Sequence, residues 1–271
     1  MASPVTLFIV EGERRDVRFL NDLADEITAG ARTVETLVLP ASQNIYMIYD
    51  QLKEDDFETD IIEVLRESSP KAASLLADLQ RDDVDEVYLF FDFDPQHFKY
   101  KGMDNAKDES SNILAKMLEV FDNETDLGKL YISYPMIEAA YDYKRGESLC
   151  AAYSSCFIPF ASLNKYKSLA GKDNPIASEH KLQWKELLNV FTQRAVCLLD
   201  RESIGFSEYR QYVTPILIYR EEEKLLNNNN VVFCLSALPE FLLDYYGEEY
   251  WHDNIDGEVI NRRECDKRDI P

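Results

Sequence analysis

Short apolar runs alternate with longer amphipathic segments through the first half of the chain. Helical periodicity from Val17 to Ile27 follows the first run, an acidic helical stretch at about 43–80 follows the second, and a helix at about 109–122 follows the third. The runs themselves are rich in Val, Leu, Ile, Phe and Tyr, which is typical of buried strands: 5–10, 34–39, 86–91 and 129–134. The alternation predicts an α/β fold, a parallel sheet with helices on both faces.

The alternation fades after about residue 145. A mostly helical pattern follows, in which Pro215 should break or kink one helix. The expected elements are helices at about 181–200, 204–226 and 235–250, and a loop of four asparagines at 227–230. We therefore expect a catalytic α/β domain at about 1–145 and a mostly helical C-terminal region at 146–271.

Composition narrows the class of protein. A chain of 271 residues with 45% hydrophobic residues can bury a sizeable core. Its net charge of −22 argues against a protein that coats nucleic acid through a basic surface, although an enzyme can still contact phosphates through metal ions and a few basic side chains. The five cysteines form no CxxC pair, so reduced, mostly buried thiols are expected. The chain shows no signal sequence and no apolar stretch of about 18 residues, so a cytoplasmic protein without a membrane span is expected.

Acidic residues follow three of the apolar runs. Glu11 comes after LFIV, Asp92 and Asp94 lie at the end of VYLFFDFD, and Glu138 follows LYISYPMI. The carboxyl ends of parallel strands form the edge where open α/β sheets bind ligands. Carboxylates gathered there repel one another unless a cation is present, so the pattern predicts a magnesium site.

The Asp92-Phe93-Asp94 triplet suits a metal ligand pair. Alternate residues of an extended strand point the same way, so both carboxylates can converge while Phe93 turns into the core. Glu138 lies inside the apolar sequence MIEAAY, where a carboxylate needs a metal or a basic partner. An exposed glutamate on a short helix is the alternative for Glu138, and a polar strand end is the alternative for the triplet.

Basic residues follow Glu11 and Gly12. The glycine permits a sharp turn into the next helix, whose N-terminus can bind an anion. Arg14, Arg15 and Arg18 lie in its first turns, where the helix dipole disfavours cations. Contact with a phosphate backbone and pairing with nearby acidic residues explain them equally well.

VEG after an apolar strand, with DxD after a later strand, resembles a Toprim domain, the catalytic module of type IA topoisomerases, DnaG-type primases and OLD-type nucleases. The resemblance covers about residues 5–142, and YPMIEAAYD resembles the element after DxD in Toprim nucleases of bacterial phage defence. In these motifs the chain also resembles the DUF4435 kind, the AriB-like effectors of PARIS systems.

The resemblance implies roles for these residues. Glu11 would be the Toprim glutamate, a metal ligand or general acid/base; Asp92 and Asp94 would be metal ligands, and Glu138 a further one. The metal would be Mg²⁺ or Mn²⁺, as one or two ions. Family members often carry an acidic residue four positions after the glutamate, but this chain has Arg15 there and Asp16 one later. The basic residue that nuclease-type Toprims use downstream would be Lys165 or Lys167, for which a solvated loop is the alternative.

The function so implied is hydrolysis of phosphodiester bonds in DNA or RNA, a tRNA included. The chain would be a toxic effector of abortive infection in antiviral defence. A regulatory protein partner, of which an ATPase is one form, would hold it inactive, and a homodimer is left open. Topoisomerase and primase activity are not expected, because the chain lacks their further domains.

The sequence is also compatible with other functions. A phosphatase of the haloacid-dehalogenase type also has DxD after a strand, but early in the chain and without the Pro95 that follows here. Glycosyltransferases use DxD for a nucleotide-sugar metal, which would leave Glu11 unexplained. An acidic partner-binding protein that mimics nucleic acid is the non-enzymatic alternative. The aromatic residues of the C-terminal region fit a base-stacking platform, or more readily a core face or partner interface: Phe241, Tyr245, Tyr246, Tyr250 and Trp251.

Overall fold

The computed structural model of the chain describes residues 5–12, 15–27, 33–39, 44–94, 106–144, 156–170, 182–201, 203–257 and 260–261. The chain divides into two compact units. The first comprises Met1–Phe91 and Pro95–Tyr131, and the second comprises Asp92–Asp94 and Ile132–Pro271. The domain boundary expected near residue 145 stays a prediction.

A five-stranded, mostly parallel sheet has the order β2-β1-β3-β5-β4. Its strands are β1 (Val5–Val10), β2 (Thr33–Val38), β3 (Val84–Asp92), β4 (Asp122–Asn123) and β5 (Gly128–Ser133). β1 pairs in parallel with β2 and β3, while the two-residue β4 pairs antiparallel with β5. The α/β class is confirmed. The purely parallel sheet is wrong at one edge, because the tight turn before Gly128 folds a strand too short to show an apolar pattern back onto β5.

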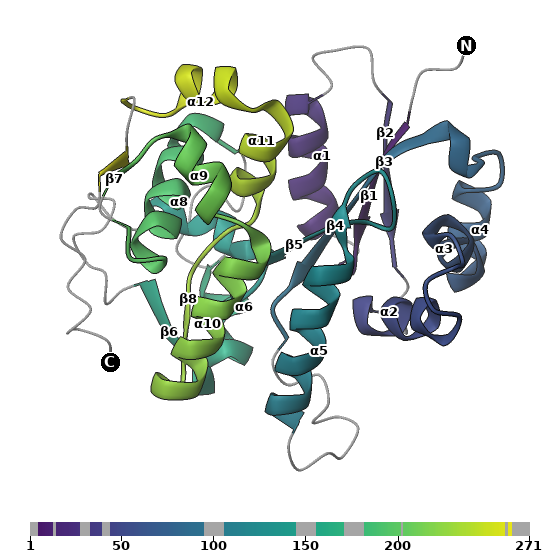
Figure 1. Cartoon of the computed structure of the whole chain (residues 1–271), viewed down its shortest axis with the longest axis horizontal. Coiled ribbons are helices and arrows are strands. Elements are labelled where there is room, and N and C mark those ends of the chain that lie inside the picture. Colours follow the sequence, from purple (N-terminus) through teal and green to yellow (C-terminus); the bar gives the residue numbers. More distant parts are fainter. Residues whose placement is uncertain are drawn as a thin grey trace. The chain divides into compact units, whose positions relative to one another are not determined.

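Helices cover both faces of the strands in the first unit. They are α1 (Arg15–Ile27), α2 (Ile45–Glu54), α3 (Ile61–Ser68), α4 (Pro70–Leu75) and α5 (Ala106–Val120). α1 lies on one side of the strands, and α3 and α4 lie on the other (Figure 1). The rings of Tyr49 in α2 and Phe121, just after α5, are 6.3 Å apart, so the end of α5 lies beside α2. The helical stretch expected at about 43–80 is interrupted at Ser69, whose side chain caps α4 while Pro70 takes the first helical position.

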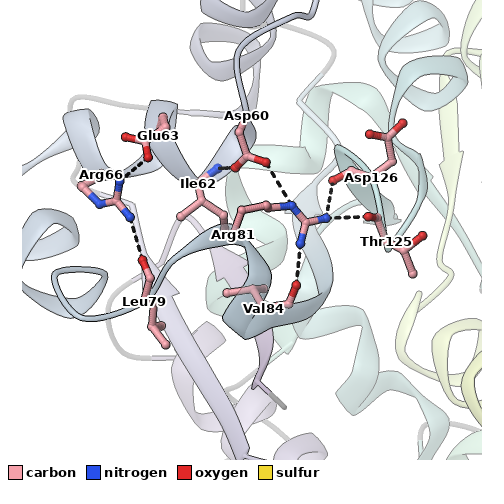
Figure 2. A network of polar contacts seen from close by, with 9 residues as sticks. All are labelled: Asp60, Ile62, Glu63, Arg66, Leu79, Arg81, Val84, Thr125 and Asp126. Atoms are coloured by element: carbon pink, nitrogen blue, oxygen red, sulfur yellow. Dashed lines mark hydrogen bonds and ion pairs between the residues drawn. The ribbon is translucent and has the colours of Figure 1, made fainter. Parts of the chain in front are cut away.

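Arg81 connects the start of β3 with the start of α3 and with the loop between β4 and β5. Arg81, in the short 3-10 helix η1 (Arg81–Asp83), pairs with Asp60 at 3.0 Å and donates to the carbonyl oxygens of Val84, Thr125 and Asp126 (Figure 2). Asp60 also accepts from the backbone N–H of Ile62 and so caps α3. This network fixes where β3 begins relative to α3 and to the loop between β4 and β5.

The second unit is mostly helical with two small sheets. Its helices are η3 (Ile137–Lys144), η5 (Phe160–Ser162), α6 (Leu163–Ala170), α8 (Trp184–Leu198), α9 (Phe206–Tyr212), α10 (Pro215–Asn229), α11 (Leu238–Tyr246) and α12 (Glu248–Asn254). Its strands are β6 (Phe157–Pro159), β7 (Ser203–Ile204), β8 (Val231–Phe233) and β9 (Ile260–Asn261). β6 pairs antiparallel with β8, and β7 pairs antiparallel with β9.

Pro215 behaves as expected, whereas the asparagine run does not. Pro215 is the first residue of α10, after a Thr214 cap, so the break expected in the helix at 204–226 is confirmed and a kink is not formed. The loop expected at 227–230 is wrong for three of its residues. Asn227–Asn229 form the last turn of α10, and only Asn230, with a left-handed φ of 54°, ends the helix.

Cysteine and membrane expectations can be compared with the described residues. Cys156, Cys197 and Cys234 are free and buried, as expected, whereas Cys150 and Cys265 lie outside the described ranges. Among the helices that the structure describes, none has the length and apolar character needed to cross a membrane.

Candidate functional site

Glu11 directly follows β1 and reaches the start of α2. Its side chain is partly exposed, and Oε1 accepts a long hydrogen bond of 3.4 Å from the backbone N–H of Ile45. Ile45 is the first residue of α2, so the carboxylate lies at a helix N-terminus, where the dipole favours negative charge. The glutamate is thus held at the carboxyl end of β1 by a helix other than the one that follows it in sequence.

The sheet order reverses between β1 and β3. From β1 the chain crosses over α1 to β2 on one side, and from β2 it crosses over α2–α4 to β3 on the other. Val10, the residue before Glu11, pairs with Phe90, two residues before Asp92. Such a reversal is the point where open α/β sheets bind ligands, outside the carboxyl ends of the strands.

Asp92 and Asp94 flank a buried phenylalanine. Phe93 is 5% exposed and packs against Tyr134, with ring centroids 5.1 Å apart, and against Tyr219 at 6.5 Å. Its backbone N–H donates to the carbonyl oxygen of Ser133 at 3.1 Å, which keeps this segment extended beside β5. Both aspartates are partly exposed. The alternation expected from the sequence, with the phenylalanine buried and the carboxylates outside the core, is present.

The carboxylate of Asp92 is oriented by the segment after β5. Its Oδ1 accepts a hydrogen bond of 2.8 Å from the backbone N–H of Ile137, the first residue of η3. Carboxylates that bind metal ions are themselves commonly held by hydrogen bonds of this kind. The contact therefore suits a ligand role and also links β3 to η3.

Glu138 is the second residue of η3 and is fully buried, at 0% exposed. The alternative of an exposed glutamate on a short helix is wrong in its exposure, because the flanking Ile137, Ala139 and Ala140 are buried too. A carboxylate in such surroundings is costly without polar partners.

The basic residues expected to contact nucleic acid are only partly described. Arg18 lies on α1 and is partly exposed, and Lys165 is exposed on α6. Arg15 and Lys167 lie in α1 and α6, but their side chains, like that of Asp16, fall outside the description, as does the whole of Arg14.

The aromatic residues of the C-terminal region split into two groups. Phe241 and Trp251 are 0% exposed, which favours the core reading for them. Tyr246 is 36% exposed and its ring stacks on that of Tyr250, with centroids 4.6 Å apart.

Within the described ranges, no three side chains of His, Cys, Asp or Glu lie close enough together to hold a metal ion. Mg²⁺, however, is usually bound by one or two carboxylates with several waters and substrate phosphates, rather than by an all-protein cage. The partly exposed pair Asp92 and Asp94 fits that donor set.

No family model, curated protein or solved structure matches the chain.

The sequence did not predict a buried ion pair that involves η3, the helix that contains Glu138. Arg194 in α8 and Asp142 in η3 form a buried pair with Nη1 and Oδ2 3.1 Å apart, and both side chains are less than a tenth exposed. The acidic partner stood within the quoted motif YPMIEAAYD. The arginine carried no signal, because it lies 52 positions away on a helix with an ordinary amphipathic pattern.

Proposed function

We propose that the chain is a metal-dependent nuclease of the Toprim type, in which Asp92 and Asp94 bind Mg²⁺ or Mn²⁺. The observation that carries the proposal is the sheet topology. Glu11 follows β1 and Asp92 ends β3, and these adjacent parallel strands are the ones between which the order reverses. An acidic edge at that point suits a cation and the phosphate that the cation attracts.

The carboxylates support distinct roles. Asp92, with its orienting bond from Ile137, is the better fixed ligand, and the partly exposed Asp94 completes the pair. Glu11 serves as a further ligand or as general acid/base, and the buried Glu138 as a further ligand. A bound divalent ion supplies polarisation of the phosphoryl oxygen and an attacking water of lowered pKa.

Single basic side chains would contact the nucleic acid. Arg18 on α1 and Lys165 on α6 are accessible to a phosphate backbone. With a net charge of −22, the chain would bind nucleic acid weakly in the absence of metal. Weak intrinsic binding is suited to a toxic effector of antiviral defence that a regulatory partner restrains until infection.

Toxicity in cells tests this function. Wild type, Glu11→Gln and Glu35→Gln are expressed from one inducible promoter, and growth and the ends of cleaved DNA and RNA are recorded. Gln at position 11 keeps an oxygen for the N–H of Ile45 but loses the charge. Glu35 lies within β2 rather than at a strand end and serves as the matched control.

We expect wild type and Glu35→Gln to be toxic with the same cleavage ends, and Glu11→Gln to be harmless. An acidic partner-binding protein or nucleic-acid mimic would keep its effect in Glu11→Gln. Equal toxicity of all three proteins would therefore sink the nuclease proposal.

A further inference from the structure

The buried guanidinium of Arg194 joins three parts of the second unit. Nη1 donates to Oδ2 of Asp142 and to the carbonyl oxygen of Cys234, both at 3.1 Å, and Nη2 donates to the carbonyl oxygen of Asp142 at 3.5 Å. Asp142 lies in η3, Cys234 directly follows β8, and Arg194 itself lies in α8. One side chain thus fixes η3 against a helix and a strand from the C-terminal region.

η3 depends on such support. It runs for eight residues, whereas 3-10 helices beyond three or four residues are uncommon because their hydrogen-bond geometry is poor. The chain just before it is held as well, since Tyr134 and Leu235 exchange two backbone hydrogen bonds of 2.8 Å. In addition, the N–H of Ala237 donates to the hydroxyl of Ser133 at 3.3 Å. The conformation of residues 133–142 is therefore imposed by residues 194 and 234–237.

η3 also positions two of the candidate acidic residues, Asp92 and Glu138. Its first N–H, that of Ile137, orients the carboxylate of Asp92, and its second residue is Glu138. A shift of η3 would move both.

We propose that Arg194 is a positioning residue of the metal site: by anchoring Asp142 it holds η3 where Ile137 orients Asp92 and where Glu138 stands. This inference rests on the proposed function and gives the C-terminal region a role in it. In this role Arg194 acts through η3 and not by contact with the metal or the nucleic acid.

Stability alone does not explain the pair. Replacing a buried ion pair by apolar residues of similar size is often neutral or stabilising, because two charges need not then be desolvated. What apolar residues cannot reproduce is the planar fork of donors, which fixes a direction as well as a contact. A variant in which apolar residues of similar size replace both partners therefore separates a positioning role from a structural one.

Binding of Mn²⁺ alone, followed by electron paramagnetic resonance of the free ion, tests the inference without requiring activity. The metal site is defined as the binding that Asp94→Asn loses, because an acidic surface also attracts cations weakly. The test variant is Arg194→Met with Asp142→Leu. The matched control is Arg81→Met, which removes an arginine with a comparable set of bonds from the first unit. Circular dichroism and urea unfolding report folding.

We expect the double variant to fold with a urea midpoint near that of wild type and to bind Mn²⁺ roughly tenfold more weakly, the usual loss when a partner of a metal ligand is removed. Arg81→Met should keep the wild-type affinity. Arg194→Lys keeps the positive charge but loses the planar arrangement of donors, so its Mn²⁺ affinity should lie between those of wild type and the double variant. If the double variant does not fold, Arg194→Lys provides the same test. Unchanged affinity in the double variant, or in Arg194→Lys where that is the variant measured, would overturn the positioning role and leave the nuclease proposal standing. Absence of the site in wild type would overturn both.

Discussion

The backbone N–H of Ile137 donates a hydrogen bond of 2.8 Å to the carboxylate of Asp92. This bond joins the last residue of β3 to the first residue of η3, within the second unit. Asp92 therefore has a structural role that does not depend on its charge, because a neutral amide oxygen can accept the same hydrogen bond.

Stability should distinguish two substitutions of Asp92. Asp92→Ala leaves the N–H of Ile137 without its acceptor, which costs roughly 1–3 kcal/mol when such a group is buried. Asp92→Asn keeps an acceptor oxygen and should cost about 1 kcal/mol or less. Urea unfolding of the three proteins measures the difference. Equal stability of the two variants would show that the bond contributes nothing to folding.

Glu222 should make the chain less stable as the pH rises. It is fully buried in α10, and burial raises the pKa of its carboxyl well above the ordinary value, with the hydrogen bond from Phe233 N–H as a smaller opposing effect. The folded chain therefore keeps a proton that the unfolded chain releases near pH 4.5. The contribution of Glu222 to the free energy of unfolding is fully present below that pH. It is lost as the pH rises towards the folded pKa, by up to about 1.4 kcal/mol per pH unit.

Glu222→Gln removes this dependence because an amide does not ionise, and its amide oxygen can still accept from the N–H of Phe233. We expect its stability relative to wild type to increase from about pH 5 to about pH 8, measured by urea unfolding. The matched control is Glu221→Gln, the neighbouring residue, which pairs with Lys224 and is partly exposed. A constant difference between Glu222→Gln and wild type across this range would contradict the prediction.

Two glycines should tolerate alanine to different degrees. Gly128 and Gly247 both have positive φ, of 106° and 77°, so alanine is strained at each by roughly 1–3 kcal/mol. At Gly128 the added methyl would also lie 2.6 Å from Cδ1 of the buried Leu89, whereas nothing lies within 4 Å at Gly247. Gly128→Ala should therefore cost about 1–3 kcal/mol more than Gly247→Ala in thermal or urea unfolding. Equal losses of stability in the two variants would mean that the side chains around Leu89 shift to accommodate the methyl group at no cost.

The sequence predicted the elements whose signals are local. Apolar runs located β1, β2, β3 and β5 to within two residues, and Pro70 and Pro215 marked helix starts. Local signals failed for Asn227–Asn229, because α10 continues until a left-handed residue, Asn230, ends it. The short strands β6 to β9 also escaped, since two or three residues are too few for a periodic pattern.

The candidate site depended on longer-range relationships. Sequence alone placed Glu11, Asp92 and Asp94 at strand ends, as the structure has them. It could not anticipate that Ile45 holds Glu11 or that Ile137 holds Asp92, and it left open whether Glu138 is buried. Those contacts join residues at least 34 positions apart and arise only when the sheet and η3 are assembled.

Nuclease activity of the purified chain is measured directly as cleavage of total cellular DNA and RNA, with the fragment ends identified by sequencing. Wild type, Asp92→Asn and Asp60→Asn are compared with Mg²⁺, with Mn²⁺ and with a chelator. Asp60 serves as control because it too accepts a backbone N–H, that of Ile62, but caps α3 instead of ending β3.

We predict selective fragments from wild type and Asp60→Asn that require a divalent ion, and a loss of roughly a hundredfold or more in Asp92→Asn. Wild-type fragments that persist in the chelator, the same fragments from Asp92→Asn, or no fragments from wild type would show that the chain is not a metal-dependent nuclease with Asp92 as a ligand.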